Sequence, residues 1–124
     1  MKLSGVHHIA LNVDDVEKTT NFYVDVLGLE KVDRPDFGFP GSWLRLADGR
    51  QIHLVKAEDH KAPRGQHFAL HVADLDEARQ ELTDQGFKVS EPMMIPGIGT
   101  RQAFLKDPSG NLIELNENPI DVFA

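Results

Sequence analysis

Four side chains able to bind a metal ion stand at matching places in the two halves of the sequence. In each half, a glycine-containing turn leads into an Ile-X-Leu strand whose middle residue can bind a metal, and an earlier strand contains a histidine. The residues at these places are His8 and His53 in the first half and His67 and Glu114 in the second. Three imidazoles and one carboxylate suit a divalent Zn, Ni, Fe, Co or Mn ion. The pattern therefore predicts a metal site built from a repeated unit.

Alternating apolar residues predict the strands that carry these four side chains. The strands are expected at Gly5–Val13, Gln51–Lys56, Gln66–Ala73 and Leu112–Asn116. The apolar residues of each strand share the face that packs on a helix, so each metal-capable side chain lies on the opposite face. If the two halves pack around a pseudo-twofold axis, the four side chains converge on one concave surface.

Two amphipathic helices and two loops complete the repeat. Helical spacing predicts helices from Val16 to Gly28 and from Leu75 to Gly86, each preceded by a capping aspartate. A short strand is expected at Phe87–Ser90, and the Pro- and Gly-rich segments 34–42 and 91–99 are expected to be loops. The predicted order of elements in each half is therefore β-α-β-β-β. The boundaries are one domain over 1–124, with module one at 5–57, a linker at 58–65 and module two at 66–118.

The composition limits the classes of partner and compartment. The chain has 13 basic and 20 acidic residues, a net charge of -7, and no cysteine. An acidic surface repels a phosphate backbone and anionic lipid, so neither nucleic acid nor membrane is an expected partner. No apolar run reaches bilayer length, nothing after Met1 resembles a leader peptide, and no disulfide or thiolate site is possible. We expect a soluble cytoplasmic protein that acts on a small molecule.

Several further residues have two interpretations each. His53 is either a fourth metal ligand or an acid/base group beside a triad of two histidines and one carboxylate. His71 either lines the pocket or packs, and the aromatic residues are either substrate contacts or core. The arginines either clamp an anion or lie in solvent. The candidate pocket residues are Asn12, Arg34, Phe37, Trp43, His71 and Arg101.

Three motifs resemble those of the vicinal oxygen chelate superfamily, which joins glyoxalase I, bleomycin- and fosfomycin-resistance proteins and extradiol dioxygenases. They are HHIALNVDDVEKTTNFYVDVLGLE, HFALHVADLDEA and FLKDPSGNLIELNE, and they span nearly the whole chain. The resemblance, closest to a glyoxalase-like subgroup, implies an α+β fold. In it, two βαβββ modules form an eight-stranded, cup-shaped mixed sheet with helices on its outer face. It also implies a divalent metal bound by His8, His53, His67 and Glu114, or iron bound without His53.

The function expected from this resemblance is that of a metal-dependent, glyoxalase-like lyase or isomerase. The metal would chelate neighbouring oxygens of a small substrate, and Glu114 or His53 would move a proton next to a carbonyl. Glyoxalase I enzymes of bacterial type usually have Glu at the position of His53, so this chain differs from them there. Two alternatives stay open: an Fe(II) extradiol-type ring-cleaving dioxygenase, and a resistance protein that binds an antibiotic or another small molecule. The family commonly pairs subunits, which predicts a homodimer.

Overall fold

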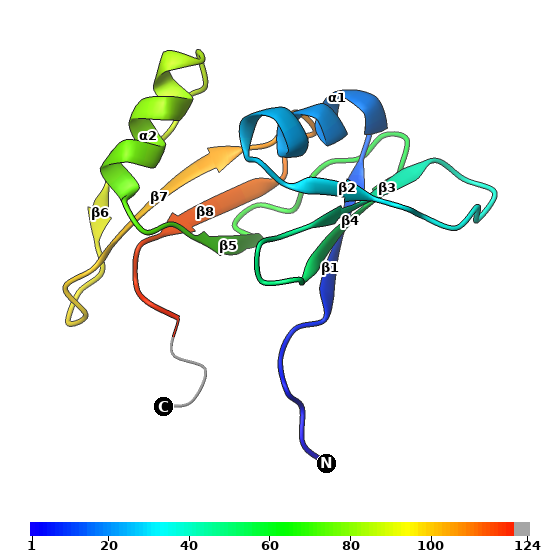
Figure 1. Ribbon diagram of the computed structural model, residues 1–124. Helices are drawn as coiled ribbons and strands as arrows, with labels where there is room; N and C mark the ends of the chain where they lie inside the picture. The colour runs from blue at the N-terminus through cyan, green and yellow to red at the C-terminus, as the bar shows by residue number, and fades with distance from the viewer. Residues whose placement is uncertain (121–124) are drawn as a thin grey trace. The chain divides into compact units, whose positions relative to one another are not determined.

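A computed structural model of the chain describes residues 1–120, which form two compact units (Figure 1). Unit 1 consists of Met1–Ala62 together with Pro108–Asn111, and unit 2 consists of Pro63–Asp107 together with the chain from Leu112 on. Each unit holds one four-stranded mixed sheet and the helix that follows its first strand. The α+β class and the repeated βαβββ order are confirmed. The joining of the two sheets into an eight-stranded cup stays a prediction.

The sheet of unit 1 has the strand order β1-β4-β3-β2. Strands β1 and β4 run parallel, and the other neighbours run antiparallel. Along β1 and β4 the less exposed residues are those of one face, as the alternation predicts: Ile9, Leu11, Val13, Ile52 and Leu54. The elements are β1 (His8–Val13), α1 (Val16–Asn21), the π-helical turn η1 (Phe22–Val26), β2 (Glu30–Val32), β3 (Gly41–Arg45) and β4 (Gln51–Lys56).

The helix of unit 1 begins as expected and ends differently. The Asp15 carboxylate caps α1 by accepting a hydrogen bond from the Lys18 backbone N–H at 2.9 Å. The last turn is π-helical, so the expected continuous α-helix is wrong there. In that turn the Leu27 N–H donates to the Phe22 carbonyl at 3.1 Å. The wider turn lets the consecutive side chains of Phe22 and Tyr23 both be buried.

The sheet of unit 2 repeats this arrangement with the strand order β5-β8-β7-β6. Strands β5 and β8 run parallel, at the place that β1 and β4 occupy in unit 1. Helix α2 is capped by Asp74, whose carboxylate accepts from the Glu77 N–H at 2.9 Å, as the sequence predicts. The elements are β5 (His67–His71), α2 (Leu75–Asp84), β6 (Met93–Met94), β7 (Arg101–Lys106) and β8 (Leu112–Asn116).

The short edge strand of unit 2 lies later in the chain than expected. Residues 87–90 form no strand, and β6 falls at Met93–Met94, inside the segment expected to be a loop. Ser90 still lies beside β7, where its N–H donates to the Phe104 carbonyl at 2.9 Å. The return bond runs from the Phe104 N–H to the Ser90 hydroxyl at 2.8 Å, so a side chain replaces the backbone ladder. Pro92, which has no N–H, follows closely, and the ladder resumes only after it.

Hydroxyl pairs fasten the helix of unit 1 to its surroundings. The Thr20 and Ser42 hydroxyls lie 2.7 Å apart and join α1 to β3. The Thr19 hydroxyl lies 2.8 Å from that of Ser109, in the turn 108–111. All four side chains are buried, so each hydroxyl needs such a partner.

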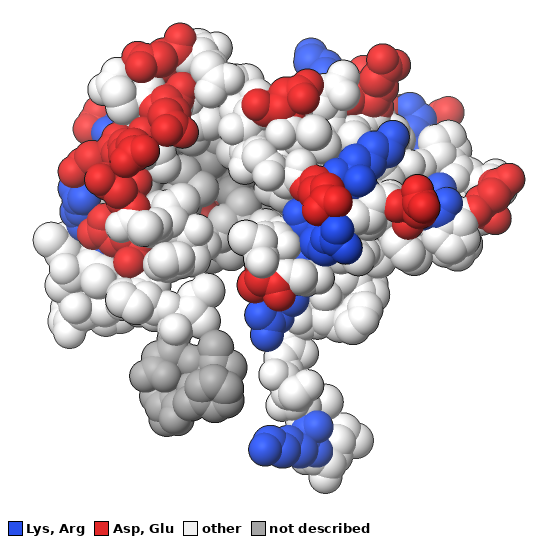
Figure 2. Space-filling view, in the orientation of Figure 1, with Lys and Arg blue, Asp and Glu red and all other residues white. Residues whose placement is uncertain are grey.

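The exposed face of α2 is acidic. Figure 2 shows carboxylates gathered over this helix, where Asp76, Glu77, Glu81 and Asp84 are all exposed. A surface of this sign repels phosphate groups. Among the described residues, no helix is both long enough and apolar enough to span a bilayer.

Candidate metal and substrate site

Strands β1 and β4 bring two of the four predicted ligands side by side in unit 1. Their parallel register sets Ala10 opposite His53, and His8 lies two residues before Ala10 on the same face. The two imidazole rings stack, with centroids 4.2 Å apart and planes 20° apart. His53 is half-buried, whereas His8 is exposed.

Strands β5 and β8 bring the other two together in unit 2 by the same register. Ala69 lies opposite Glu114, and His67 lies two residues before Ala69. The Nε2 atom of His67 is 3.2 Å from Oε1 of Glu114. The equivalence of the two pairs, expected from the sequence repeat, thus holds at the level of strand register.

The far side of the His67 ring fixes its tautomer. Its Nδ1 atom lies 2.9 Å from the carbonyl oxygen of Gly65, which can only accept, so Nδ1 carries the hydrogen. In the neutral ring, Nε2 then carries the lone pair and faces the Glu114 carboxylate; in the protonated ring, Nε2 carries a second hydrogen and donates it to that carboxylate. Two acceptor atoms at 3.2 Å need a proton or a cation between them.

Glu114 is held from its other side as well. The Asn116 side-chain amide donates to Oε2 at 2.8 Å, so one oxygen is anchored and the other faces His67. The residue is only 7% exposed, and a buried carboxylate is costly unless it is paired. Anchoring of this kind is typical of metal ligands, whose outer partners orient them.

The spacing of the unit 2 pair fits a divalent ion. Zn–N and Zn–O bonds are about 2.0–2.2 Å long, which places neighbouring ligand atoms about 3 Å apart at tetrahedral or right angles. The 3.2 Å between His67 and Glu114 meets that requirement, and the donor types suit the same ions.

The unit 1 pair offers neutral imidazoles. Burial, and then the charges of His8, His7 and Arg34, lower the pKa of His53, which favours the uncharged ring that a metal binds. The Nε2 atom of His53 lies 2.9 Å from the Gln51 side-chain oxygen, so that nitrogen carries the hydrogen and Nδ1 keeps the lone pair. Binding through Nε2 would require Gln51 to turn away.

The two pairs belong to different units. Within residues 1–120, no group of three or more His, Asp or Glu side chains gathers closely enough to hold a metal ion. A single ion bound by all four residues therefore stays a prediction. The chemistry of each pair is compatible with it.

Among the predicted pocket residues, Trp43 has the most informative position. It lies opposite His53 in the β3–β4 register, and the indole stacks on the imidazole with centroids 4.3 Å apart and planes 7° apart. Phe37 lies 6.1 Å from the indole, and Arg34 lies 4.9 Å from the Phe37 ring centroid. Sequence reasoning placed these residues in a pocket but missed the stacking, although the register of the Asp48–Gly49 hairpin would have revealed it.

The other predicted pocket residues have different contacts. Arg101 is engaged in unit 2, where its guanidinium binds Asp76 at 3.1 Å and Glu117 at 3.0 Å. These ion pairs favour a structural role for Arg101. His71 is exposed at the end of β5, opposite Asn116. Asn12 is also exposed, and its backbone carbonyl accepts a hydrogen bond from the Asn111 side chain at 3.0 Å.

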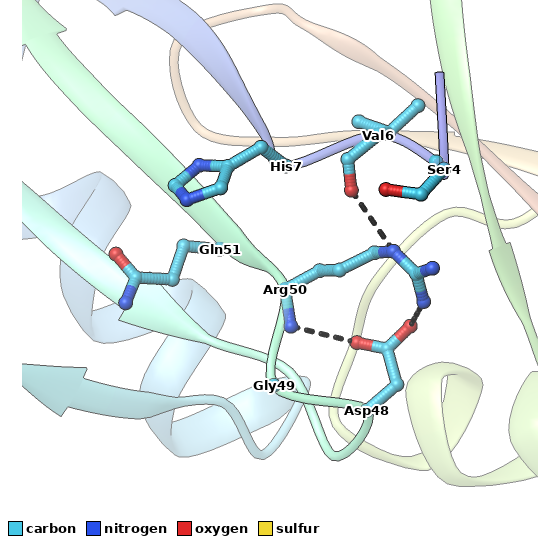
Figure 3. Close-up of a pocket in the computed structure, with 8 residues that line it drawn as sticks. Ser4, Val6, His7, Asp48, Gly49, Arg50 and Gln51 are labelled. Carbon is cyan, nitrogen blue, oxygen red and sulfur yellow. Dashed lines mark hydrogen bonds and ion pairs between the residues drawn. The ribbon is translucent and has the colours of Figure 1, made fainter. Parts of the chain in front are cut away.

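An open hollow of about 390 Å³ lies beside the start of β1 in unit 1 (Figure 3). Arg50 is one of the residues that line it. The Nε of Arg50 donates to the Val6 carbonyl, and its Nη1 donates to the Asp48 carboxylate, both at 2.9 Å. Arg50 therefore ties the N-terminal segment to the β3–β4 turn. Its lining residues are Ser4, Gly5, Val6, His7, Asp48, Gly49, Arg50 and Gln51.

Paired βαβββ units that carry metal-capable side chains on their parallel strands define a protein of the vicinal oxygen chelate type. The sequence model of the Glyoxalase/Bleomycin resistance protein/Dioxygenase superfamily matches residues 5–115, and the chain belongs to this superfamily.

The chain is similar to several known members. It is 30% identical to a lactoylglutathione lyase of Haemophilus influenzae, with 90% of each chain covered. A crystal structure of a Bacillus anthracis protein assigned to the glyoxalase family superposes with a TM-score of 0.84 at 25% identity, covering 96% of this chain and 98% of that one. The fold also matches the fosfomycin resistance protein FosX of Listeria monocytogenes in complex with Mn(II). That match has a TM-score of 0.81 at 20% identity, covering 98% of this chain and 97% of the other.

Proposed function

We propose that the protein is a metal-dependent, glyoxalase-like lyase or isomerase that acts on a small molecule with two neighbouring oxygens. The proposed ligands of a divalent ion are His8, His53, His67 and Glu114. The observation that carries the proposal is the unit 2 pair: the Nε2 atom of His67 lies 3.2 Å from Oε1 of Glu114, and a hydrogen bond holds the other side of each side chain. Similarity to a lactoylglutathione lyase supports the reaction class.

In the proposed reaction, the metal and the side chains of the site would have different roles. A divalent ion supplies Lewis-acid stabilisation for negative charge on the substrate oxygens. The Glu114 carboxylate, which Asn116 orients, would take a proton from the carbon next to a carbonyl and return it to the neighbouring carbon. His53 is the alternative group for this proton transfer, and in that role it would not bind the metal. No redox partner is needed, because only a proton moves.

A second candidate function is that of an Fe(II) ring-cleaving dioxygenase. The observation that favours it is the bond between His53 and Gln51, which occupies Nε2 of His53. His8, His67 and Glu114 would then form a triad of two histidines and one carboxylate, a ligand set typical of non-haem Fe(II) oxygenases. His53 would act on protons without binding the metal.

Metal analysis tests the proposed ligands. Protein purified without chelator should hold close to one equivalent of divalent metal, Glu114→Gln should lose most of it, and Glu81→Gln, a matched change on the exposed face of α2, should keep it. If neither the parent nor Glu81→Gln holds metal in stoichiometric amount, the metal proposal fails and a role in small-molecule binding without metal takes its place.

Activity assays separate the two reactions. Isomerisation of the methylglyoxal hemithioacetal should rise in His53→Glu, which restores the carboxylate usual in bacterial glyoxalase I. Ring cleavage of catechols by the Fe(II)-reconstituted parent, together with no isomerase activity in either protein, would favour the dioxygenase.

The proposal also includes a homodimer in the cytoplasm. Apolar side chains on the β6 edge of unit 2 support association, because Met93, Met94 and Ile98 are 44%, 61% and 56% exposed. Light scattering of the purified protein should give the mass of two chains. A monomer at micromolar concentration would contradict this part.

A further inference from the structure

A continuous row of rings leads away from His53 in unit 1. We define the aromatic row as Phe39, Phe37, Trp43 and His53. The centroids of Phe39 and Phe37 are 5.8 Å apart, those of Phe37 and Trp43 6.1 Å, and those of Trp43 and His53 4.3 Å. Phe37 is 50% exposed and Phe39 is 47% exposed. The row therefore begins at a proposed metal ligand and ends on uncovered aromatic surface.

The arginine beside this row differs from most of the other arginines. Four arginines form ion pairs with carboxylates: Arg45, Arg50, Arg79 and Arg101. In the part of the chain that the structure describes, no carboxylate oxygen lies within 4.0 Å of the Arg34 guanidinium nitrogens. In a chain with a net charge of -7, a half-buried guanidinium without an acidic partner calls for a reason.

Arg34 is nevertheless held firmly in place. Its Nη1 donates to the Phe39 carbonyl at 3.1 Å, and its guanidinium carbon lies 4.9 Å and 5.0 Å from the ring centroids of Phe37 and Phe39. The guanidinium also packs against the backbone of β3 at Gly41. A Cβ atom at that position would lie only 2.8 Å from Nη2 of Arg34. A fixed guanidinium with unused donors is suited to bind a carboxylate or another planar anion.

We propose that the substrate has a flat apolar body, such as an aromatic ring, that packs on the aromatic row, and an anionic group that Arg34 binds. Aromatic stacking and a charge-assisted hydrogen bond then act on opposite parts of one molecule, while the part nearest His53 carries the reacting oxygens. The inference rests on the proposed function for the orientation of the substrate, since the row begins at His53, a proposed metal ligand. The binding of a flat anion does not itself require the metal.

Fluorescence of Trp43, the only tryptophan in the chain, gives a direct measurement. Chelator-treated protein is titrated with benzoate, with benzamide as the neutral ring of equal shape, and with acetate as the anion without a ring. Benzoate should bind at least tenfold more tightly than either. Arg34→Gln should reduce the affinity for benzoate to that for benzamide, and Arg45→Gln, an exposed arginine of β3 paired with Glu30, should leave it unchanged.

The outcomes separate this inference from the proposed function. Equal affinities of the parent for benzoate and benzamide would overturn the inference without recourse to any variant. An unchanged benzoate affinity in folded Arg34→Gln, checked by circular dichroism, would also overturn it. Glu114→Gln should keep benzoate binding while it loses metal, so a missing metal in the parent refutes the metal proposal and leaves the benzoate result standing.

Discussion

Replacement of Asn116 by alanine tests whether the anchored carboxylate of Glu114 is a metal ligand. The change removes the 2.8 Å hydrogen bond to Oε2 and leaves that oxygen, on a residue only 7% exposed, without this partner. A hydrogen bond to a charged group contributes about 1.5–3 kcal/mol, and about 1.4 kcal/mol corresponds to a factor of ten in affinity. Loss of an outer partner of a metal ligand costs about 10–100-fold. We therefore expect the dissociation constant for Mn(II) or Zn(II) to rise at least tenfold.

Competition with a chromogenic chelator measures this constant, and urea unfolding of the metal-free protein measures the accompanying loss of stability, about 1–3 kcal/mol. Asn118→Ala is the matched control, because Asn118 donates to Asn116 through its backbone N–H, which the substitution keeps. If Asn116→Ala loses stability but binds metal as tightly as the parent, Glu114 is a buried structural carboxylate and the reasoning is refuted. A weaker site in Asn118→Ala would show that the effect comes from disturbance of the chain after β8.

Two further predictions concern unit 1. Burial, and then the charge of His8, lower the pKa of His53, so the folded, metal-free protein binds fewer protons than the unfolded chain. The free energy of unfolding should therefore fall as pH decreases from the ordinary histidine pKa of about 6.5 toward the lower pKa of the folded state. A free energy of unfolding that does not change with pH in the parent would contradict this prediction. The same dependence on pH in His53→Gln would contradict it too. Thr20→Val should cost about 1–3 kcal/mol because the buried Ser42 hydroxyl, 2.7 Å away, loses its partner. The double variant with Ser42→Ala should cost less than the sum of the two single changes in urea unfolding, and simple additivity would show that the bond contributes nothing.

The repeat made the strands and the four candidate ligands predictable from the sequence. Each half carries its metal-capable residues at the same offset on a parallel strand pair, and alternation alone assigns their face. Asn116 was also within reach of that reasoning, since a residue two positions after Glu114 shares its face. It was overlooked because a neutral amide on a strand has many ordinary roles.

The features that sequence reasoning missed depend on contacts between distant residues. The edge strand forms at Met93–Met94 and not at 87–90 because the Phe104 N–H donates to the Ser90 hydroxyl, where a regular strand pair would use a backbone carbonyl. Strand propensities do not predict such a side-chain hydrogen bond. The lack of a carboxylate partner for Arg34 within residues 1–120 likewise follows from tertiary packing. Aspartates lie close to Arg34 in the sequence, so an ion pair between Arg34 and one of them was a reasonable expectation. How the two units join was a prediction from symmetry and stays one.

The turn 108–111 has a consequence for dissecting the molecule. It belongs to unit 1, where Ser109 contacts Thr19 and Asn111 contacts His60, although both strands that flank it belong to unit 2. The duplicated halves are therefore not separable by one cut. A fragment that ends at residue 62 would lack the hydroxyl that faces its own first helix, and the remaining fragment would carry a turn whose partners are elsewhere. Cleavage after residue 62 yields pieces suited to fragment complementation, in which each half folds fully only in the presence of the other.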